Sequence, residues 1–224
     1  LSLAPHSLLS LSLSLLSAEA NTDPAKKFQV TLSMLEIYNE QVRDLFVKTN
    51  PSGGLKVRQH PKLGCQVVGL SDKAVGSYEE IDARVEEATA NRTVAATQMN
   101  ATSSRAHTVV MITYVVVEKD AKGPGKDKET KSKINLIDLA GSERAESTGA
   151  TGDRLKEGAA INLSLTMLGN VITALAEKSN NPKKKVMVPY RESKLTQILQ
   201  VRTIRPSLSL SFSLCLFVRL FSLV

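Results

Sequence analysis

The stretch INLIDLAGSER, residues 134–144, limits what this chain can fold into more than any other part of it. An apolar run from Ile134 to Ile137 is typical of a buried strand. Asp138 ends that run, and its carboxylate can hold Mg²⁺ through water, because hard cations prefer oxygen ligands. Gly141 lets a backbone N–H approach a phosphate with no side chain in the way. The pattern indicates either a nucleotide site or a strand followed by an ordinary turn.

Composition excludes several classes of protein. The 224 residues are enough for one domain with a hydrophobic core, and 42% of them are hydrophobic. Two cysteines, Cys65 and Cys215, have no motif spacing, which indicates a reducing compartment without a disulfide framework. A net charge of +7 favours an acidic partner surface. The chain has no tryptophan, which argues against a base-stacking platform, so we expect no nucleic-acid partner.

Both ends of the chain have an unusual composition. Residues 1–27 begin with a Leu/Ser repeat that lacks the positive region of a secretory signal, although its alternation also fits an amphipathic strand. Residues 201–224 form a second Leu/Ser/Phe-rich segment, and Arg219 makes it a poor membrane span, so we expect no direct membrane insertion. A translated CT repeat encodes Leu-Ser, and we expect both ends to be gene-model artefacts outside the fold.

Between these ends the pattern is that of an α/β domain. The expected elements are a strand from Phe28, a short helix at 36–45, a turn at 50–54, short strands within 55–70, a helix from Ser77, a strand at 108–117, and a charged hairpin loop at 119–133. Ser77 and Glu80 have the spacing of a capping box. The helix after them has one apolar face, which contains Ile81, Val85 and Ala88.

A second helix of about twenty residues is expected near Leu155. Five apolar residues follow at steps of four, three, four and three and predict a stripe that packs against the core: Ile161, Leu165, Leu168, Ile172 and Leu175. A lysine-rich loop at 180–185 ends this helix, and residues 188–194 open another. The lysines are either ordinary solvated charge or a basic docking edge.

The segment NATSSRAH, residues 100–107, connects the helix after Ser77 with the strand at 108–117. Ser103 and Ser104 can contact Mg²⁺ or a phosphate through their hydroxyls, and Arg105 can clamp a phosphate. The alternative is a polar loop with a helix-capping serine.

Five motifs in order resemble the kinesin motor domain over residues 28–200: LEIYNEQVRDLF, NATSSRAH (switch I), DLAGSER (switch II), INLSLTMLGNVITALA and VPYRESKLTQIL. The HPKLG, RTVAATQMN and STGATGDRLKEGA segments and the lysine loop look most like the vesicle- and organelle-transporting kinesins. The resemblance implies an α/β, three-layer P-loop NTPase fold in which LEIYNEQVRDLF forms a strand and a helix. It also implies a cytoplasmic, microtubule-associated ATPase whose cofactors are ATP and Mg²⁺.

The resemblance also implies roles for single residues. Ser103 and Ser104 would sense the γ-phosphate, Ser104 and Asp138 would hold Mg²⁺ largely through water, and Gly141 would meet the γ-phosphate. Arg105 would pair with Glu143 and close the site around the attacking water, and Asn162 would link a loop to the long helix. Asn100 would complete the nucleotide contacts.

The implied partner is tubulin, whose acidic surface would attract basic residues. We expect the following residues to contact it: Arg58, Lys62, Lys183, Lys184, Lys185, Arg191 and Lys194. Cargo would be bound through regions outside this chain.

Two departures from the family pattern affect the expected activity. Ala106 stands where the family usually has serine, and no G-x-x-x-x-G-K-[ST] loop occurs in the chain. We therefore expect an incomplete central sheet, without its first strands and phosphate loop, and a chain that is itself inactive as an ATPase. Three hypotheses remain open: a truncated motor, a non-catalytic microtubule-binding module, and a mispredicted product that does not fold.

Overall fold

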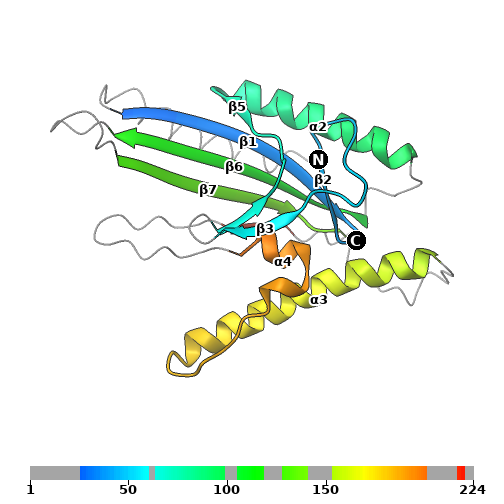
Figure 1. The fold of residues 1–224 in the computed structure, drawn as a ribbon, viewed down its shortest axis with the longest axis vertical. Coiled ribbons are helices and arrows are strands. Elements are labelled where there is room, and N and C mark those ends of the chain that lie inside the picture. The colour runs from blue at the N-terminus through cyan, green and yellow to red at the C-terminus, as the bar shows by residue number, and fades with distance from the viewer. Residues whose placement is uncertain are drawn as a thin grey trace.

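The computed structural model of the chain describes residues 26–60, 64–98, 105–118, 128–140, 153–200 and 216–219. Its elements are β1 (Lys26–Tyr38), β2 (Gln41–Asp44), β3 (Val57–His60), β4 (Gly64–Val67), β5 (Lys73–Val75), α2 (Tyr78–Gln98), β6 (His107–Glu118), β7 (Lys128–Asp138), α3 (Asp153–Asn180), η3 (Tyr190–Glu192), α4 (Lys194–Ile198) and β8 (Leu216–Arg219). In this part of the chain one sheet lies between α2 on one face and α3 with α4 on the other (Figure 1). This arrangement confirms the predicted three-layer α/β class.

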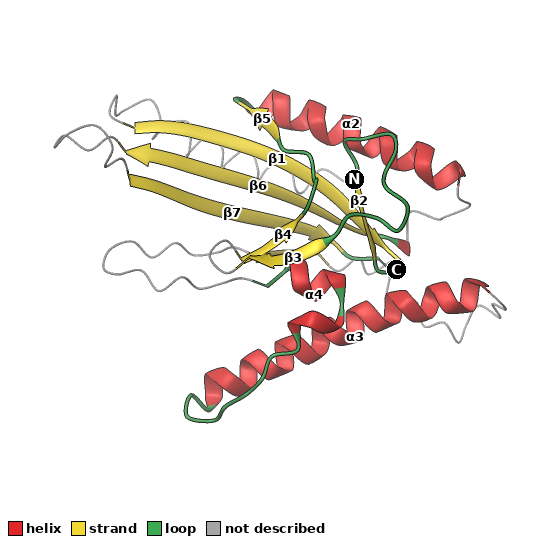
Figure 2. Cartoon of the chain, in the orientation of Figure 1, coloured by secondary structure: helices red, strands yellow, loops and turns green. Residues whose placement is uncertain are grey.

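Three long antiparallel strands form the centre of the sheet (Figure 2). β1 pairs with β6, and β6 pairs with β7, in the order β2-β1-β6-β7-β8, with β5 on β1. β-branched residues dominate β6, and their side chains fit a pleated, half-buried surface. The pairing of β6 with β7 confirms the hairpin expected around the charged loop, of which residues 119–127 lie outside the described part.

β8 comes from the Leu/Ser/Phe-rich C-terminal segment. It pairs with β7 in parallel, with Asn135 opposite Leu216. That both end segments are gene-model artefacts stays a prediction, and residues 1–25 lie outside the described part of the chain.

The prediction of a helix at 36–45 is wrong, because this stretch forms the hairpin of β1 and β2. Asn39 and Glu40 have φ angles of 49° and 58°, the left-handed conformation that both central residues of a two-residue hairpin turn adopt. Leu35, Ile37 and Val42 are all buried on one face. The correct period is therefore the two-residue period of a strand.

The helix α2 begins as predicted. The Ser77 hydroxyl accepts a hydrogen bond from the Glu80 N–H at 3.3 Å, and the Glu80 carboxylate accepts one from the Gly76 N–H at 2.8 Å. Ile81 and Ala88 are buried against the sheet and Val85 packs beside them, which confirms the predicted apolar face.

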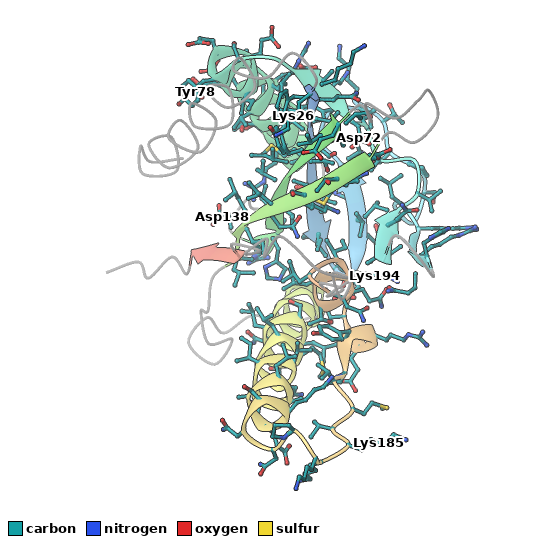
Figure 3. The ribbon with its side chains drawn as sticks, turned by 90° about the vertical axis from the view of Figure 1, so that its left-hand side faces the viewer. Lys26, Asp72, Tyr78, Asp138, Lys185 and Lys194 are labelled. Carbon is teal, nitrogen blue, oxygen red and sulfur yellow. The ribbon has the colours of Figure 1, made fainter. Side chains whose placement is uncertain are left out.

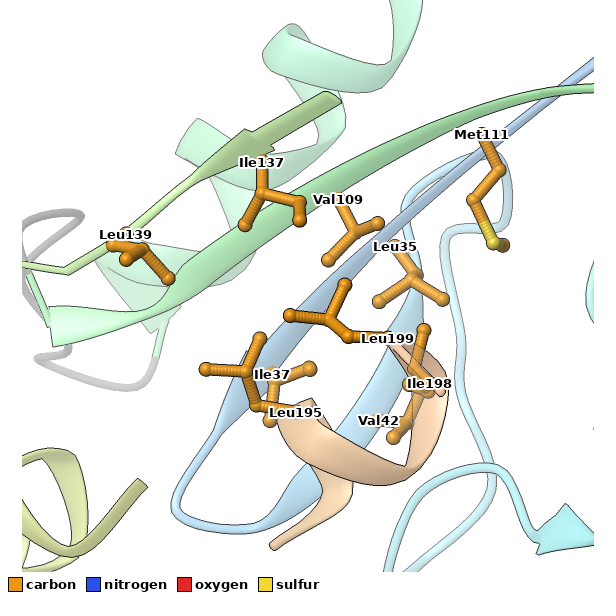
Figure 4. Packing of buried hydrophobic residues seen from close by; sticks show 10 residues of the cluster. All are labelled: Leu35, Ile37, Val42, Val109, Met111, Ile137, Leu139, Leu195, Ile198 and Leu199. Carbon is orange, nitrogen blue, oxygen red and sulfur yellow. The ribbon is translucent and has the colours of Figure 1, made fainter. Parts of the chain in front are cut away.

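The opposite face of the sheet packs against α4 (Figure 4). Ten buried side chains form this cluster: Leu35, Ile37, Val42, Val109, Met111, Ile137, Leu139, Leu195, Ile198 and Leu199. The β3–β4 hairpin contributes Val57 and Val67 at its border. Non-directional burial of this apolar surface holds the layers together.

The apolar stripe predicted on α3 packs only in part. Leu165 and Leu168 contact the core, but Ile172 and Leu175 are 59% and 41% exposed. Val171, which lies outside the predicted stripe, is buried instead, as is the polar Ser164. The helix runs past the sheet toward the lysine loop, so its distal turns lie beyond the described core (Figure 1). Ile161 lies in a part of the helix whose side chains are not described. No helix among the described residues has both the length and the apolar character of a membrane span.

Candidate functional site

The described ends of the two segments expected to bind nucleotide lie at one edge of the sheet. Thr108, near the start of β6, lies directly opposite Asp138, the last residue of β7. Antiparallel pairing brings the start of one strand beside the end of the next. The residues around Arg105 and those around Ala140 therefore flank the same edge, where Figure 3 shows Asp138 at the end of β7 beside β8.

His107 forms a three-way junction at this edge. Its Nδ1 accepts a hydrogen bond from the Ala140 N–H at 2.9 Å, and its Nε2 lies 2.7 Å from the Ser164 Oγ of α3. The ring is 2% exposed, and burial lowers the pKa of His107 from 6.5 to about 4. The imidazole is therefore neutral at physiological pH, and it connects β6, the residues after β7, and α3.

Arg92 of α2 supports the same edge from the other face. Its Nη2 donates to the carbonyl oxygen of Ala106 at 3.2 Å, and its Nε lies 3.7 Å from Glu36 Oε2. Arg43 lies 3.6 Å from the other oxygen of Glu36, whose side chain is 8% exposed. A buried carboxylate needs such compensation. The ion pair of Arg92 with Glu36 holds α2 against β1, and its hydrogen bond to Ala106 holds the helix against the start of β6.

The described residues at this edge fit a water-coordinated Mg²⁺ ion. Asp138 is half-buried and supplies carboxylate oxygens, which are hard ligands suited to this cation. The Thr108 hydroxyl oxygen, in the opposite register position, is buried and has no hydrogen-bond partner among the described residues. Buried hydroxyls normally have partners, so this one is available to bond a water of the metal's shell.

Several predicted site residues lie outside the described part of the chain: Asn100, Ser103, Ser104, Gly141 and Glu143. Of the predicted nucleotide-site residues, Arg105 and Asp138 are described, and both are half-buried near the sheet edge. The expected pairing of Arg105 with Glu143 and the expected phosphate contacts stay predictions. The side chain of Asn162, expected to link a loop to α3, is half-buried on that helix.

The predicted basic residues lie on elements of the α3 and α4 side. Arg58 on β3, Arg191 on η3 and the three lysines at 183–185 are exposed, whereas Lys194 is half-buried at the start of α4. Figure 3 shows Lys185 near the far end of α3, well separated from Asp138. Lys62 lies outside the described part. The structure thus separates the lysine loop from the sheet edge that is expected to bind nucleotide.

Sequence reasoning missed three residues: His107 and Ser164, which join β6 to α3 at this edge, and Glu40, whose carboxylate accepts hydrogen bonds from Ser193 and Lys194 at the start of α4. His107 is the last residue of the NATSSRAH segment, and a lone histidine at the head of an apolar strand was a usable signal. Ser164 and Glu40 gave none, because their partners are distant in the sequence.

Comparison with known proteins gives one consistent family. Residues 7–207 match the protein family that is described as "Kinesin motor domain". Kinesin-related protein 1 of Dictyostelium discoideum is 52% identical over 185 residues, which are 82% of this chain and 8% of the relative. Human kinesin-like protein KIF13B is 51% identical over 78% of this chain and 10% of the relative. Kinesin-like protein unc-104 of Caenorhabditis elegans is 50% identical over 80% of this chain and 11% of the relative.

Solved structures agree with these sequence matches. A KIF14 dimer with AMP-PNP in complex with a microtubule has a TM-score of 0.72 and 37% identity, covering 87% of this chain and 53% of that one. A KIF14 structure with ADP on a microtubule has a TM-score of 0.70 and 37% identity, covering 84% and 53%. The chain thus spans about half of these structures and roughly a tenth of the curated relatives. KIF13B and unc-104 support the subfamily resemblance noted from the lysine loop.

Proposed function

The chain belongs to the kinesin motor domain family, and from that premise we propose that it forms part of a motor that couples ATP hydrolysis to movement along microtubules. One observation carries the proposal: Thr108 lies opposite Asp138, so the described ends of the two segments that resemble switch I and switch II flank one sheet edge. Matched structures that hold AMP-PNP or ADP on a microtubule support the choice of ligand and partner.

In this proposal the chain's own residues position the reactants. Asp138 holds Mg²⁺ through water, with Ser104 on the opposite segment, and the metal when bound neutralises phosphate charge. Ser103, Asn100 and the Gly141 N–H contact the phosphates. Arg105 pairs with Glu143 and excludes bulk water. These roles come from the family resemblance, and the shared sheet edge of Arg105 and Asp138 supports them.

The proposed track surface is basic and lies away from that edge. Arg58, Arg191 and Lys183 to Lys185 are exposed, and an acidic tubulin surface would attract them over several ångströms in low salt. Lys62 and Lys194 complete the proposed set. The protein would then work in the cytoplasm on the microtubule cytoskeleton, and it would bind its cargo through regions outside these residues.

Microtubule pelleting of the 224-residue chain tests the partner. We expect co-sedimentation that weakens steeply between low and high salt, because exposed ion pairs are screened. A variant with Lys183, Lys185 and Arg191 changed to alanine should pellet less, while Lys27→Ala, on the remote start of β1, should match the wild type. Salt-independent pelleting, or none, would contradict the proposed surface.

An ATPase assay on the same chain tests the catalytic part. We expect no appreciable turnover, because no G-x-x-x-x-G-K-[ST] loop is present to hold the β-phosphate. Robust microtubule-stimulated turnover would overturn this expectation. In a longer motor that carries the loop, Glu143→Ala should allow ATP binding but stop hydrolysis, and normal turnover there would refute the role given to Glu143.

The lack of that loop also favours a second candidate function, a non-catalytic microtubule-binding module. Salt-sensitive pelleting that is identical with ATP, ADP and no nucleotide would favour this module. Nucleotide-dependent pelleting would favour the motor instead.

A further inference from the structure

We infer that His107 is a positioning residue that joins the end of β7 to α3, so that a displacement of Ala140 is passed through the ring to Ser164. The link itself is a statement about the fold. Its use in coupling nucleotide state to the microtubule surface rests on the proposed function.

The hydrogen bonds fix one tautomer of the ring. A backbone N–H can only donate, so the bond from Ala140 requires a lone pair on Nδ1. The proton of the neutral imidazole is therefore on Nε2, which donates to the Ser164 Oγ. Both nitrogens are engaged, and His107 and Ser164 are each 2% exposed. Because both residues are buried, bulk water does not compete for either bond.

The position of the ring makes it suited to transmit movement. Ala140 follows Asp138 by two residues, and Ser164 belongs to the buried side of α3. The neighbouring contacts of α3 are apolar, through Leu165 and Leu168. Apolar contacts are non-directional and permit sliding, whereas a hydrogen-bonded ring fixes distance and angle. The polar link therefore sets the register between the helix and the strand end.

The simpler alternative is a buried histidine that only completes the core. The two readings differ in what happens at Ala140 when Ser164 is altered, because only a link transmits that change. Ser164→Ala removes the hydroxyl and keeps helix propensity high. Thr166→Val is the matched control: it removes a hydroxyl from the exposed side of the same helix, where among the described residues Thr166 bonds the carbonyl of Asn162 at 2.7 Å.

Amide hydrogen exchange of the 224-residue chain measures the link without any activity. Ser164→Ala should raise the exchange rate of the Ala140 N–H about tenfold, because this is the rate ratio that corresponds to the net free energy of one hydrogen bond. Thr166→Val should leave that rate unchanged. An unchanged Ala140 rate in Ser164→Ala would overturn the inference.

Substitution of the ring supplies a second readout. His107→Asn places a carbonyl oxygen near the position of Nδ1 but does not reach Ser164, so it should keep part of the Ala140 protection that His107→Ala loses. In the Asn background Ser164→Ala should have no further effect, because the link is already broken. Additive effects of the two changes would overturn the inference. If the Asn variant does not fold, the Ser164→Ala comparison decides alone.

The same exchange measurement in the presence of microtubules distinguishes this inference from the proposed function. Polymerised tubulin should slow Ala140 exchange in the wild type and have less effect in Ser164→Ala. If the wild type does not bind microtubules, the proposed function fails while the tubulin-free exchange still tests the link. If it binds and Ala140 responds equally in both proteins, the link is wrong and the proposed function stands.

Discussion

Glu40 caps the helix α4, although the two lie more than 150 residues apart in the chain. Its carboxylate accepts hydrogen bonds from the Ser193 hydroxyl at 3.0 Å and from the Lys194 N–H at 2.7 Å. The N-terminus of a helix has unsatisfied N–H groups and a partial positive charge, so a carboxylate is stabilising there. A residue of the tight β1–β2 turn thereby fixes the position of α4 on the sheet.

Replacing Glu40 should therefore destabilise the fold. Glu40→Ala removes both acceptors and should lower the free energy of unfolding by about 1 to 3 kcal/mol. Glu40→Gln keeps one acceptor oxygen and should lose less. Urea unfolding of the three proteins checks the order, and an alanine variant as stable as the wild type would show that the cap contributes nothing.

Stability should fall as the pH is lowered from about 6.5 to about 4, because the pKa of His107 is depressed in the fold and ordinary in the unfolded chain. In that window the unfolded state binds more protons, so the free energy of unfolding rises with pH. The full loss below the folded pKa is about 3 kcal/mol. In urea unfolding, the free energy of unfolding should rise more steeply with pH for the wild type than for His107→Gln. Both proteins have the same carboxyl groups, so the difference between the two curves cancels the effect of those groups. Parallel curves would contradict the assignment.

The three loop lysines should contribute unequally to microtubule binding. Lys184 forms an ion pair with Glu177 of α3, whereas no ion pair to Lys183 or Lys185 occurs among the described residues. Lys183→Ala and Lys185→Ala should each weaken binding about two- to five-fold at low salt, and Lys184→Ala should weaken it less. Quantitative pelleting measures the three constants. The largest loss at Lys184 would refute this ranking.

Loss of the Arg92 side chain should loosen the junction of α2 with the start of β6. Arg92→Ala removes the bond to the Ala106 carbonyl and leaves the buried Glu36 with Arg43 alone. We expect a loss of about 2 to 4 kcal/mol by thermal or urea unfolding. Arg84→Ala is the control, because its ion pair with Glu87 lies on the exposed face of α2 and should contribute little. Equal losses would contradict the role of Arg92.

Thr108→Val should separate stability from ligand binding. The buried hydroxyl has no partner among the described residues, so its replacement should leave the free chain as stable or up to about 1 kcal/mol more stable. If the hydroxyl bonds a water of a bound Mg²⁺ ion, the same variant should bind Mg²⁺ more weakly in calorimetry. Thr113→Val, further along β6 and away from Asp138, is the control. Destabilisation without any change in Mg²⁺ binding would contradict the proposed fit.

Local patterns were sufficient for much of the fold. The apolar run before Asp138, the strand predicted at 108–117 and the Ser77–Glu80 cap each depend on neighbours within a few residues, and all three are confirmed. The hairpin at 36–45 was mistaken for a helix because charged residues interrupt its alternation. Its buried Glu36 is compensated by Arg92 on a helix that begins far along the chain, and no local period reports such a contact.

Motif identity and short-range periodicity are properties of adjacent residues, so the family, the order of most elements and the residues expected at the nucleotide edge could all be predicted from the sequence. Three features could not be predicted in this way and are seen in the folded chain alone: which stripe residues of α3 are buried, the contact of Glu40 with α4, and the link that His107 makes between Ala140 and Ser164. Hydrogen bonds and burial of this kind depend on how segments far apart in the chain are placed in three dimensions. The strand register that sets Thr108 opposite Asp138, for example, brings His107 beside Ala140.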